Sequence, residues 1–239
     1  MTSEAYEPRS EYQVKGAARD ETTVRVEIRI ESQLTGATRA SGVVAIIDVF
    51  HAFSTAAVAL ANGASRVIMV STVEEALALR HTGVGQICMG EVGGLPPPGF
   101  DYGNSPFEVS RVDFLDKTII QRTSAGTQGI AAAGQARRLY AASLVTAKAT
   151  ARAMRVGVPG EITLVAMGKN GTSRTDEDEI CALHLRNLLE GRPGNADAVR
   201  QLILAGGEAA RFSDPTRPDQ PRATWTSRWM STGSTSRSG

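Results

Sequence analysis

The sequence predicts an α/β fold, in which a mainly parallel or mixed sheet is covered by helices within a single domain. Short β-branched runs alternate with longer stretches rich in Ala and Leu, which is the pattern of strands followed by helices. Helices between successive strands favour a parallel sheet. The length of 239 residues lies within the range that one such domain fills.

The two ends of the chain differ in composition from its middle. Residues 1–22 show neither a helical nor a strand period, so we expect a flexible arm. Residues 212–239 are rich in Pro, Arg, Ser and Thr and cannot bury enough apolar area to become ordered, so we expect a flexible tail. The α/β catalytic domain is therefore expected at residues 23–211.

Strands are expected where β-branched and apolar residues form short runs bounded by Gly or polar residues. These runs lie at residues 43–48, 66–71, 86–89 and 118–121, near Leu139, and at 161–166. Helices are expected at 52–61, from Thr72, from about Thr127, at 146–154 and from about Asp176. Thr72 and Glu75 form a capping box at the start of their helix. The Pro-rich and Gly-rich segment after residue 89 is too long for a mere connection, which indicates a loop that serves a site.

The charge balance argues against nucleic-acid and membrane partners. Lys and Arg number 26 against 25 Asp and Glu, so no global field attracts an acidic partner. Charges interrupt every apolar run well before the roughly 20 residues that a membrane span needs. Cys88 and Cys181 lie far apart and no apolar signal segment opens the chain, so we expect a cytoplasmic protein with free thiols.

Polar residues directly after the apolar runs are the candidates for chemistry, because ligands bind beyond the carboxyl ends of parallel strands. Asp48 ends the first run and is followed by His51 at a strand-to-helix turn. Glu91 follows the run at 86–89. Four consecutive carboxylates at 176–179 begin the helix after the run at 161–166.

The run at 118–121 leads into a turn of small residues that opens a helix. Free N–H groups and the helix dipole favour an anion at such a turn. The candidate ligands of that anion are Arg122, Thr123, Ser124, Gly126 and Thr127.

Each of these features also has a structural explanation. Acidic residues in a first helical turn are commonly dipole partners, and a Gly and Ser turn is often only a cap. His51 alone is as often a packed histidine as a catalytic one, and His184 is expected on a surface face of its helix. Convergence of separated carboxylates at one edge of the sheet favours a site with the hard oxygen ligands that Mg²⁺ prefers.

Widespread hydrolase signatures are absent from the sequence. Phe50 stands where phosphatases of the haloacid dehalogenase type place a second Asp, and neither cysteine is followed six residues later by Arg. There is no Gly-x-Ser-x-Gly elbow and no Gly-Lys-Ser/Thr phosphate loop. The common phosphatase machineries are therefore excluded.

Read together, the candidate residues resemble the 2-phosphosulfolactate phosphatase family of Mg²⁺-dependent enzymes, over roughly residues 43–190. The most specific piece is the run at 99–108, Gly-Phe-Asp-Tyr-Gly-Asn-Ser-Pro-Phe-Glu. The other pieces are Ile47-Asp48-Val49, Ala61-Asn62-Gly63, Gly90-Glu91 with Gly94, Thr123-Ser124-Ala125-Gly126-Thr127 and Glu177-Asp178.

The chain departs from the family pattern at residues that would anchor the substrate. His51, Val92 and Gln128 stand where members usually carry Arg, whereas Arg122 stands where they usually carry Thr. Arginine binds phosphate, sulfonate and carboxylate through a bidentate fork that His, Val and Gln cannot reproduce. We therefore expect a substrate different from 2-phosphosulfolactate.

The resemblance implies hydrolysis of a small anionic phosphate monoester. Mg²⁺ would offset phosphoryl charge and position or activate water, and the turn at 122–127 would hold phosphoryl oxygens. Asn104 and Ser105 would orient the substrate, and His51 could protonate the leaving oxygen. Catalysis is assigned to Asp48, His51, Glu91 and Asp178, and the metal to carboxylates among Asp48, Glu91, Asp101, Glu177 and Asp178.

Two alternatives stay open. A repurposed family member could act on another phosphorylated metabolite or a nucleoside by a non-phosphatase reaction, and a degenerate one could only bind an anion or a partner. The retained carboxylates favour catalysis, because a mere binding protein needs no clustered acids around an anion. Apolar helices and family habit suggest a homo-oligomer.

Overall fold

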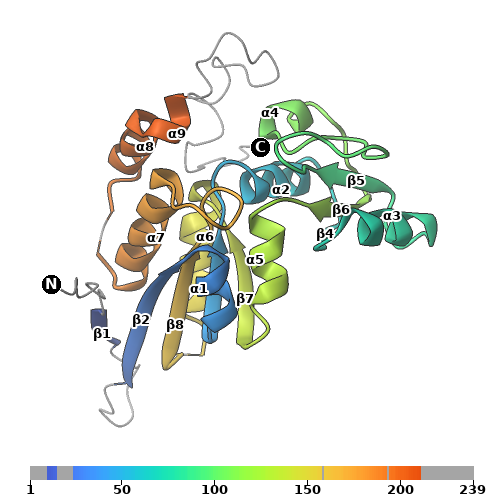
Figure 1. Ribbon diagram of the computed structural model, residues 1–239. Coiled ribbons are helices and arrows are strands. Elements are labelled where there is room, and N and C mark those ends of the chain that lie inside the picture. Colours follow the sequence, from blue (N-terminus) through green and yellow to red (C-terminus); the bar gives the residue numbers. More distant parts are fainter. Residues whose placement is uncertain (1–9, 15–23, 158, 193, 211–239) are drawn as a thin grey trace, which may run out of the picture.

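The computed structural model describes residues 10–14, 24–157, 159–192 and 194–210 (Figure 1). The tail expected at 212–239 and most of the expected arm lie outside these residues. Part of that arm forms a strand, β1 (Ser10–Val14), which pairs with β2 (Val24–Ser32). The composition of the arm predicted no strand there.

The strands of the described part form two sheets, one large and one small. The large sheet has the order β1, β2, β8 (Glu161–Ala166), β3 (Gly42–Ile47) and β7 (Ala136–Ala142), and all its neighbours are parallel except β1 and β2. The small sheet has the order β4 (Arg66–Met69), β6 (Thr118–Arg122) and β5 (Ile87–Gly90), all parallel. The α/β class is confirmed, but the strands that were expected in one sheet are divided between two.

Helices follow most of the strands and cover the sheets (Figure 1). They are α1 (Gln33–Arg39), α2 (Ala52–Ala61), α3 (Val73–His81), α4 (Pro106–Val109), α5 (Gly126–Ala132), α6 (Ala147–Met154), α7 (Asp176–Leu189), α8 (Ala196–Ala205) and α9 (Gly207–Ala210), with a 3-10 turn, η1 (Leu144–Thr146), before α6.

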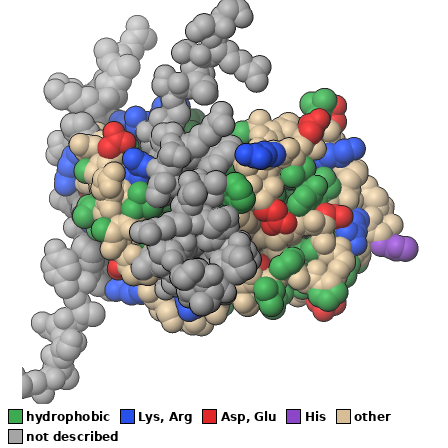
Figure 2. Space-filling model, turned by 90° about the horizontal axis from the view of Figure 1, so that it is seen from above, with side chains coloured by type: hydrophobic (Ala, Val, Ile, Leu, Met, Phe, Trp, Pro, Cys, Tyr) green, Lys and Arg blue, Asp and Glu red, His purple; other side chains and the backbone are tan. Residues whose placement is uncertain are grey.

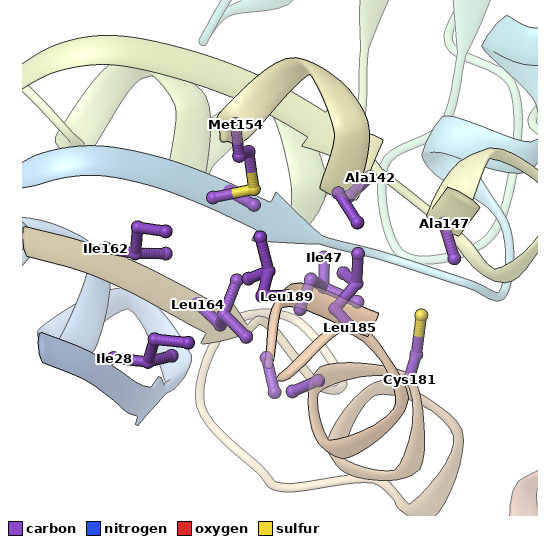
Figure 3. Packing of buried hydrophobic residues seen from close by; sticks show 14 of the residues in the cluster. Ile28, Ile47, Ala142, Ala147, Met154, Ile162, Leu164, Cys181, Leu185 and Leu189 are labelled. Carbon is purple, nitrogen blue, oxygen red and sulfur yellow. The ribbon is translucent and has the colours of Figure 1, made fainter. Parts of the chain in front are cut away.

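The large sheet is buried on both faces, because its central strands are nearly continuous apolar runs. On one face, Ile162 and Leu164 of β8 pack with Leu185 and Leu189 of α7 (Figure 3). On the other face, apolar residues of β3 and β8 pack with those of α1, α2 and α5. Burying each large apolar side chain contributes about 1.5–3 kcal/mol, so β3 and its carboxyl end are firmly held.

The chain passes between the two sheets twice, and this brings two helix starts together. α2 leads from β3 of the large sheet to β4 of the small one, and α5 leads from β6 back to β7. A Cβ atom built on Gly126, the first residue of α5, would lie 2.8 Å from the Cβ of Ala52, the first residue of α2. The carboxyl ends of β3 and β6 therefore converge.

Most predicted elements are confirmed, including the strands at 43–48 and 161–166 and the helix at 52–61. The backbone N–H of Glu75 donates to Thr72 Oγ1 at 3.0 Å, as the capping box predicts. The Glu75 carboxylate accepts a hydrogen bond from the N–H of Ser71 rather than of Thr72.

Cys88 and Cys181 are free thiols, as the sequence predicts, and both are buried. Burial raises the pKa of both thiols above the ordinary value. Within the described ranges, none of the helices has the length and apolar character that crossing a membrane requires.

His184 is buried within α7, so its predicted place on a surface face is wrong. Only 1% of the residue is exposed, and neither ring nitrogen has a hydrogen-bond partner among the described residues. A Cβ atom on Gly194 would lie 2.8 Å from its Nδ1 atom, so the loop before α8 covers the ring. Burial, followed by the charge of Lys148, lowers the pKa of His184 below its ordinary 6.5.

We expect acid to destabilise the fold through His184. Because its folded pKa is lowered, the unfolded chain binds the proton more tightly. The contribution to stability is complete above pH 6.5 and is lost as the pH falls below it, by up to about 1.4 kcal/mol per pH unit. His184→Met should remove this loss, whereas His81→Met, at an exposed histidine, should keep it. Urea unfolding at a series of pH values measures the effect, and equal acid slopes in wild type and His184→Met would contradict it.

Candidate active site

Asp48 follows β3, and two helix starts hold its carboxylate. The residue is 6% exposed. Its Oδ1 atom accepts a hydrogen bond from the N–H of Ala52 at 3.0 Å, and its Oδ2 atom accepts one from the N–H of Gly126 at 2.9 Å. Hydrogen bonds from helix starts suit a carboxylate, so the position and direction of this side chain are fixed.

Asp178, in the first turn of α7, is fixed beside Asp48. Its Oδ1 atom accepts a hydrogen bond from the N–H of Val49, and its Oδ2 atom accepts one from the N–H of Gly168, both at 2.8 Å. Val49 directly follows Asp48, so the two carboxylates are held by adjoining pieces of backbone. Asp178 and Glu177 are buried, which separates them from the exposed Asp176 of the same turn.

Burial and repulsion make both aspartates hard to ionise. Burial is the largest cause that raises the pKa of Asp48 to about 7, and the charges of Glu91 and Glu177 add to it. Burial, then the charges of Asp48 and Glu177, raises the pKa of Asp178 well above its ordinary value. No Lys or Arg of the described segments forms an ion pair with either aspartate. Such a cluster of acids is stabilised by a cation or a shared proton.

The turn after β6 binds carboxylates of the protein itself. The N–H of Ser124 donates to Glu91 Oε1 at 2.6 Å, and that of Gly126 donates to Asp48. The N–H groups of Thr123 and Thr127 each donate to the hydroxyl of the other residue. The sequence analysis predicted that the N–H groups of this turn are free to bind a substrate anion. In the structure, acceptors of the protein occupy those of Thr123, Ser124, Gly126 and Thr127.

Arg122 and Gln128 join the ends of neighbouring strands. Arg122 donates through Nη1 to the Glu91 carbonyl at 2.8 Å and through Nε to the Ser71 carbonyl at 3.3 Å. Gln128 Nε2 donates to the same Ser71 carbonyl at 2.9 Å. Backbone carbonyls thus engage two nitrogens of the Arg122 guanidinium. The sequence analysis proposed Arg122 as a ligand of a substrate anion and did not predict these bonds.

His51 and Asn104 differ in their surroundings. His51 directly precedes α2, its carbonyl accepts hydrogen bonds from Thr55, and its ring lies 5.8 Å from that of Phe50. The Oδ1 atom of Asn104 is buried and has no hydrogen-bond partner within the described part of the chain. His51 lies at the same strand end as Asp48, and Asn104 keeps acceptor capacity for a ligand.

Asp101 and Ser105 have local structural partners instead. Asp101 forms an ion pair with Arg80 at 3.1 Å and accepts a hydrogen bond from the N–H of Cys88 at 2.8 Å. Ser105 caps α4, because its hydroxyl accepts a hydrogen bond from the N–H of Glu108. The hydrogen bonds and ion pair found for Asp101 in the described part of the chain join it to Cys88 and Arg80, so its place in a common metal site stays a prediction.

The oxygen atoms around Asp48 suit a hard divalent cation. Each carboxylate oxygen of Asp48 and Asp178 accepts one N–H and keeps a second lone pair. No group of three or more His, Cys, Asp or Glu residues in the described ranges has the geometry to hold a metal by itself. Mg²⁺ commonly takes only one or two carboxylates and completes its shell with water and substrate phosphate. The donor set therefore fits Mg²⁺ in a site completed in that way.

Two buried polar side chains near these carboxylates were not predicted. Thr175 is the N-cap residue of α7, but its hydroxyl makes no capping hydrogen bond and Oγ1 has no partner among the described residues. Gln121 donates through Nε2 to the Ala52 carbonyl at 2.8 Å, and the described residues offer its Oε1 atom no partner. Two features of the sequence could have indicated them. Thr175 directly precedes the acidic run at 176–179, and Gln121 ends the apolar run at 118–121.

Comparisons with known proteins agree on one family. The family model described as 2-phosphosulpholactate phosphatase matches residues 29–211. A protein of Bacillus subtilis named probable 2-phosphosulfolactate phosphatase is 32% identical over 177 residues, which cover 72% of this chain and 75% of the relative. A protein with the same name from Thermotoga petrophila is 43% identical, over 70% of this chain and 71% of its own length. Another from Deinococcus radiodurans is 39% identical, over 55% of this chain and 55% of its own length.

Proposed function

This chain belongs to the 2-phosphosulpholactate phosphatase family, and from that premise we propose that it hydrolyses a small phosphate monoester at the carboxyl end of the large sheet. The pair Asp48 and Asp178 is the observation that supports this location of the site. Both carboxylates are buried, both are aimed by backbone N–H groups, and neither forms an ion pair with a described cation. Buried acids arranged in this way are costly unless a cation or a shared proton stabilises them, and such groups concentrate at functional sites.

Asp48 and Asp178 are proposed to hold Mg²⁺, with Glu177 beside them. A bound Mg²⁺ would offset phosphoryl charge and polarise water. The raised pKa values support this role, because they reflect repulsion that a cation relieves. Asp101 is left out of the proposed ligand set because it pairs with Arg80.

Other groups of the chain are proposed to orient Asp48, to donate a proton and to contact the substrate. The N–H groups of Ala52 and Gly126 orient Asp48 without any rearrangement during the reaction. His51, at the start of α2, is the proposed proton donor to the leaving oxygen. Asn104 and Thr175 keep unused hydrogen-bonding capacity, and they are the polar groups proposed to contact the substrate.

The substrate is proposed to differ from 2-phosphosulfolactate. The resemblance places Arg in most relatives where this chain has His51, Val92 and Gln128, so three bidentate anion anchors are missing. Arg122 is not proposed as a bidentate anchor in their place, because backbone carbonyls engage two of its nitrogens.

We expect the full chain to release phosphate from at least one small monoester in the presence of Mg²⁺. A panel of phosphorylated metabolites that includes 2-phosphosulfolactate tests this, with excess chelator and then added Mg²⁺ as the control. The best substrate should reach a kcat/KM of about 10⁴ M⁻¹s⁻¹ or more and exceed 2-phosphosulfolactate at least about tenfold. Release of phosphate from no member of the panel would refute the phosphatase proposal, and undiminished turnover in chelator would refute the metal.

A further inference from the structure

The loop after Glu91 forms a tight hairpin at residues 92–95 that carries two exposed apolar side chains. The N–H of Val92 donates to the Leu95 carbonyl at 2.9 Å, and the reverse hydrogen bond is 3.3 Å long. Gly93 and Gly94 between them both have positive φ, 62° and 91°, as a type I′ turn requires. Paired residues of this kind place their side chains on one face, about 5 Å apart. Val92 is 46% exposed and Leu95 is 66% exposed.

Hydrogen bonds attach the 92–95 hairpin to the candidate active site. The N–H of Gly94 donates to Glu91 Oε2 at 2.7 Å, and the N–H of Gly93 donates to Ser124 Oγ at 3.2 Å. Ser124 belongs to the turn whose Gly126 N–H holds Asp48. The apolar pair is therefore fixed at the carboxyl end of the small sheet, linked to Asp48 through one short turn.

The polar groups beneath the 92–95 hairpin are already engaged. The Glu91 carboxylate accepts hydrogen bonds from Gly94 and from the backbone and hydroxyl of Ser124. The hairpin itself contains no Lys, Arg or His. Lys and Arg side chains are scattered among acidic and apolar ones on the described surface shown in Figure 2. Arg122 is a cation beneath the hairpin, and the carbonyls of Glu91 and Ser71 already engage two of its nitrogens. The hairpin residues themselves thus offer a neighbouring ligand apolar contact and no positive charge.

We propose that Val92 and Leu95 are specificity-determining residues, which select phosphate monoesters with an apolar substituent beside the phosphate over monoesters with a second anionic group. This inference rests on the proposed function, because it places the phosphate at Asp48 and Asp178. A substituent that reaches the hairpin would bury methylene or ring carbons against both side chains. Pocket contacts of one methylene change selectivity by roughly 10- to 200-fold, so the pair is large enough to set a preference.

The test compares benzyl phosphate with phosphoglycolate as substrates of the full chain. Val92→Ser and Leu95→Ser should each lower the ratio of kcat/KM for benzyl phosphate over phosphoglycolate at least about fivefold, mainly through KM for benzyl phosphate. The turnover of phosphoglycolate should change less than about twofold. Leu115→Ser is the matched control. Leu115 is similarly exposed, at 63%, but lies before the amino end of β6, whereas the hairpin lies at the carboxyl end of the small sheet. It should leave the ratio unchanged.

A binding measurement separates this inference from the proposed function. Phenylphosphonate and phosphonoacetate have no leaving group, so calorimetric titration with Mg²⁺ present reports recognition alone. The hairpin variants should lose affinity for phenylphosphonate and keep it for phosphonoacetate. If wild type hydrolyses monoesters but neither ratio responds to the hairpin variants, the specificity role is overturned and the phosphatase stands. If the variants change only the sedimentation of the protein, the pair contacts a second copy and the specificity role is likewise overturned.

Discussion

Asp178→Asn is expected to lower kcat/KM for phosphate release at least about 100-fold, which equals about 2.7 kcal/mol of transition-state stabilisation. Asn keeps one acceptor for the N–H of Val49 or Gly168 but presents NH₂ to the other and cannot offer a charged ligand to Mg²⁺. The unpaired N–H costs about 1–3 kcal/mol of stability, and removal of a buried charge offsets part of that cost. The variant should therefore stay folded.

Initial rates on the best substrate and urea unfolding of the same preparations check this expectation. Asp176→Asn is the matched control, because Asp176 lies in the same helical turn but is exposed. It should keep activity within about twofold, as exposed acids at a helix start contribute only a few tenths of a kcal/mol or little more. Near wild-type turnover in folded Asp178→Asn would remove Asp178 from the catalytic centre.

Gly90→Ala is expected to be the most destabilising single change at the small sheet, with a loss of about 4 kcal/mol or more. Gly90 ends β5 with a φ of 143°, a region that side chains disfavour. A Cβ atom there would lie 1.8 Å from the Arg122 carbonyl oxygen of β6, which is backbone and cannot turn away. The pairing of β5 with β6 must open, and Glu91, the next residue, must shift with it.

Thermal and urea unfolding of Gly90→Ala measure this loss. Gly134→Ala is the control, because a Cβ on Gly134 meets no atom within 4 Å. A Gly90→Ala variant as stable as Gly134→Ala would show that the strand ends are looser than the structure indicates, and that Glu91 is not fixed by them.

The strands that sequence reasoning found are those whose burial leaves an unbroken apolar run. β3 and β8 are such runs, because helices cover both of their faces. β2 was missed although Val, Ile and charged residues alternate along it, as in a strand with one polar face. The division into two sheets could not be predicted, because strand pairing joins residues far apart in the chain and local patterns do not encode it.

The sequence placed candidate site residues only where position along a single strand determines where a side chain lies. Asp48 was proposed because a carboxylate that directly follows a buried strand must lie at the sheet's end. The hydrogen bonds that occupy the N–H groups of Ser124 and Gly126 were not predicted. Their acceptors, Glu91 and Asp48, are 33 and 78 residues away in the chain. The ion pair of Asp101 with Arg80 of α3 was not predicted for the same reason, and the place of Asp101 in a metal site stays a prediction.

The position of a bound metal ion tests the central claim most directly. Crystals grown with Mn²⁺ in place of Mg²⁺ and with inorganic phosphate would show the metal by its anomalous scattering. We predict a peak at about 2.0–2.3 Å from a carboxylate oxygen of Asp48 or Asp178, with phosphate in its coordination shell. A peak at Asp101, or no peak near either aspartate in crystals of protein that is active with Mn²⁺, would contradict the account.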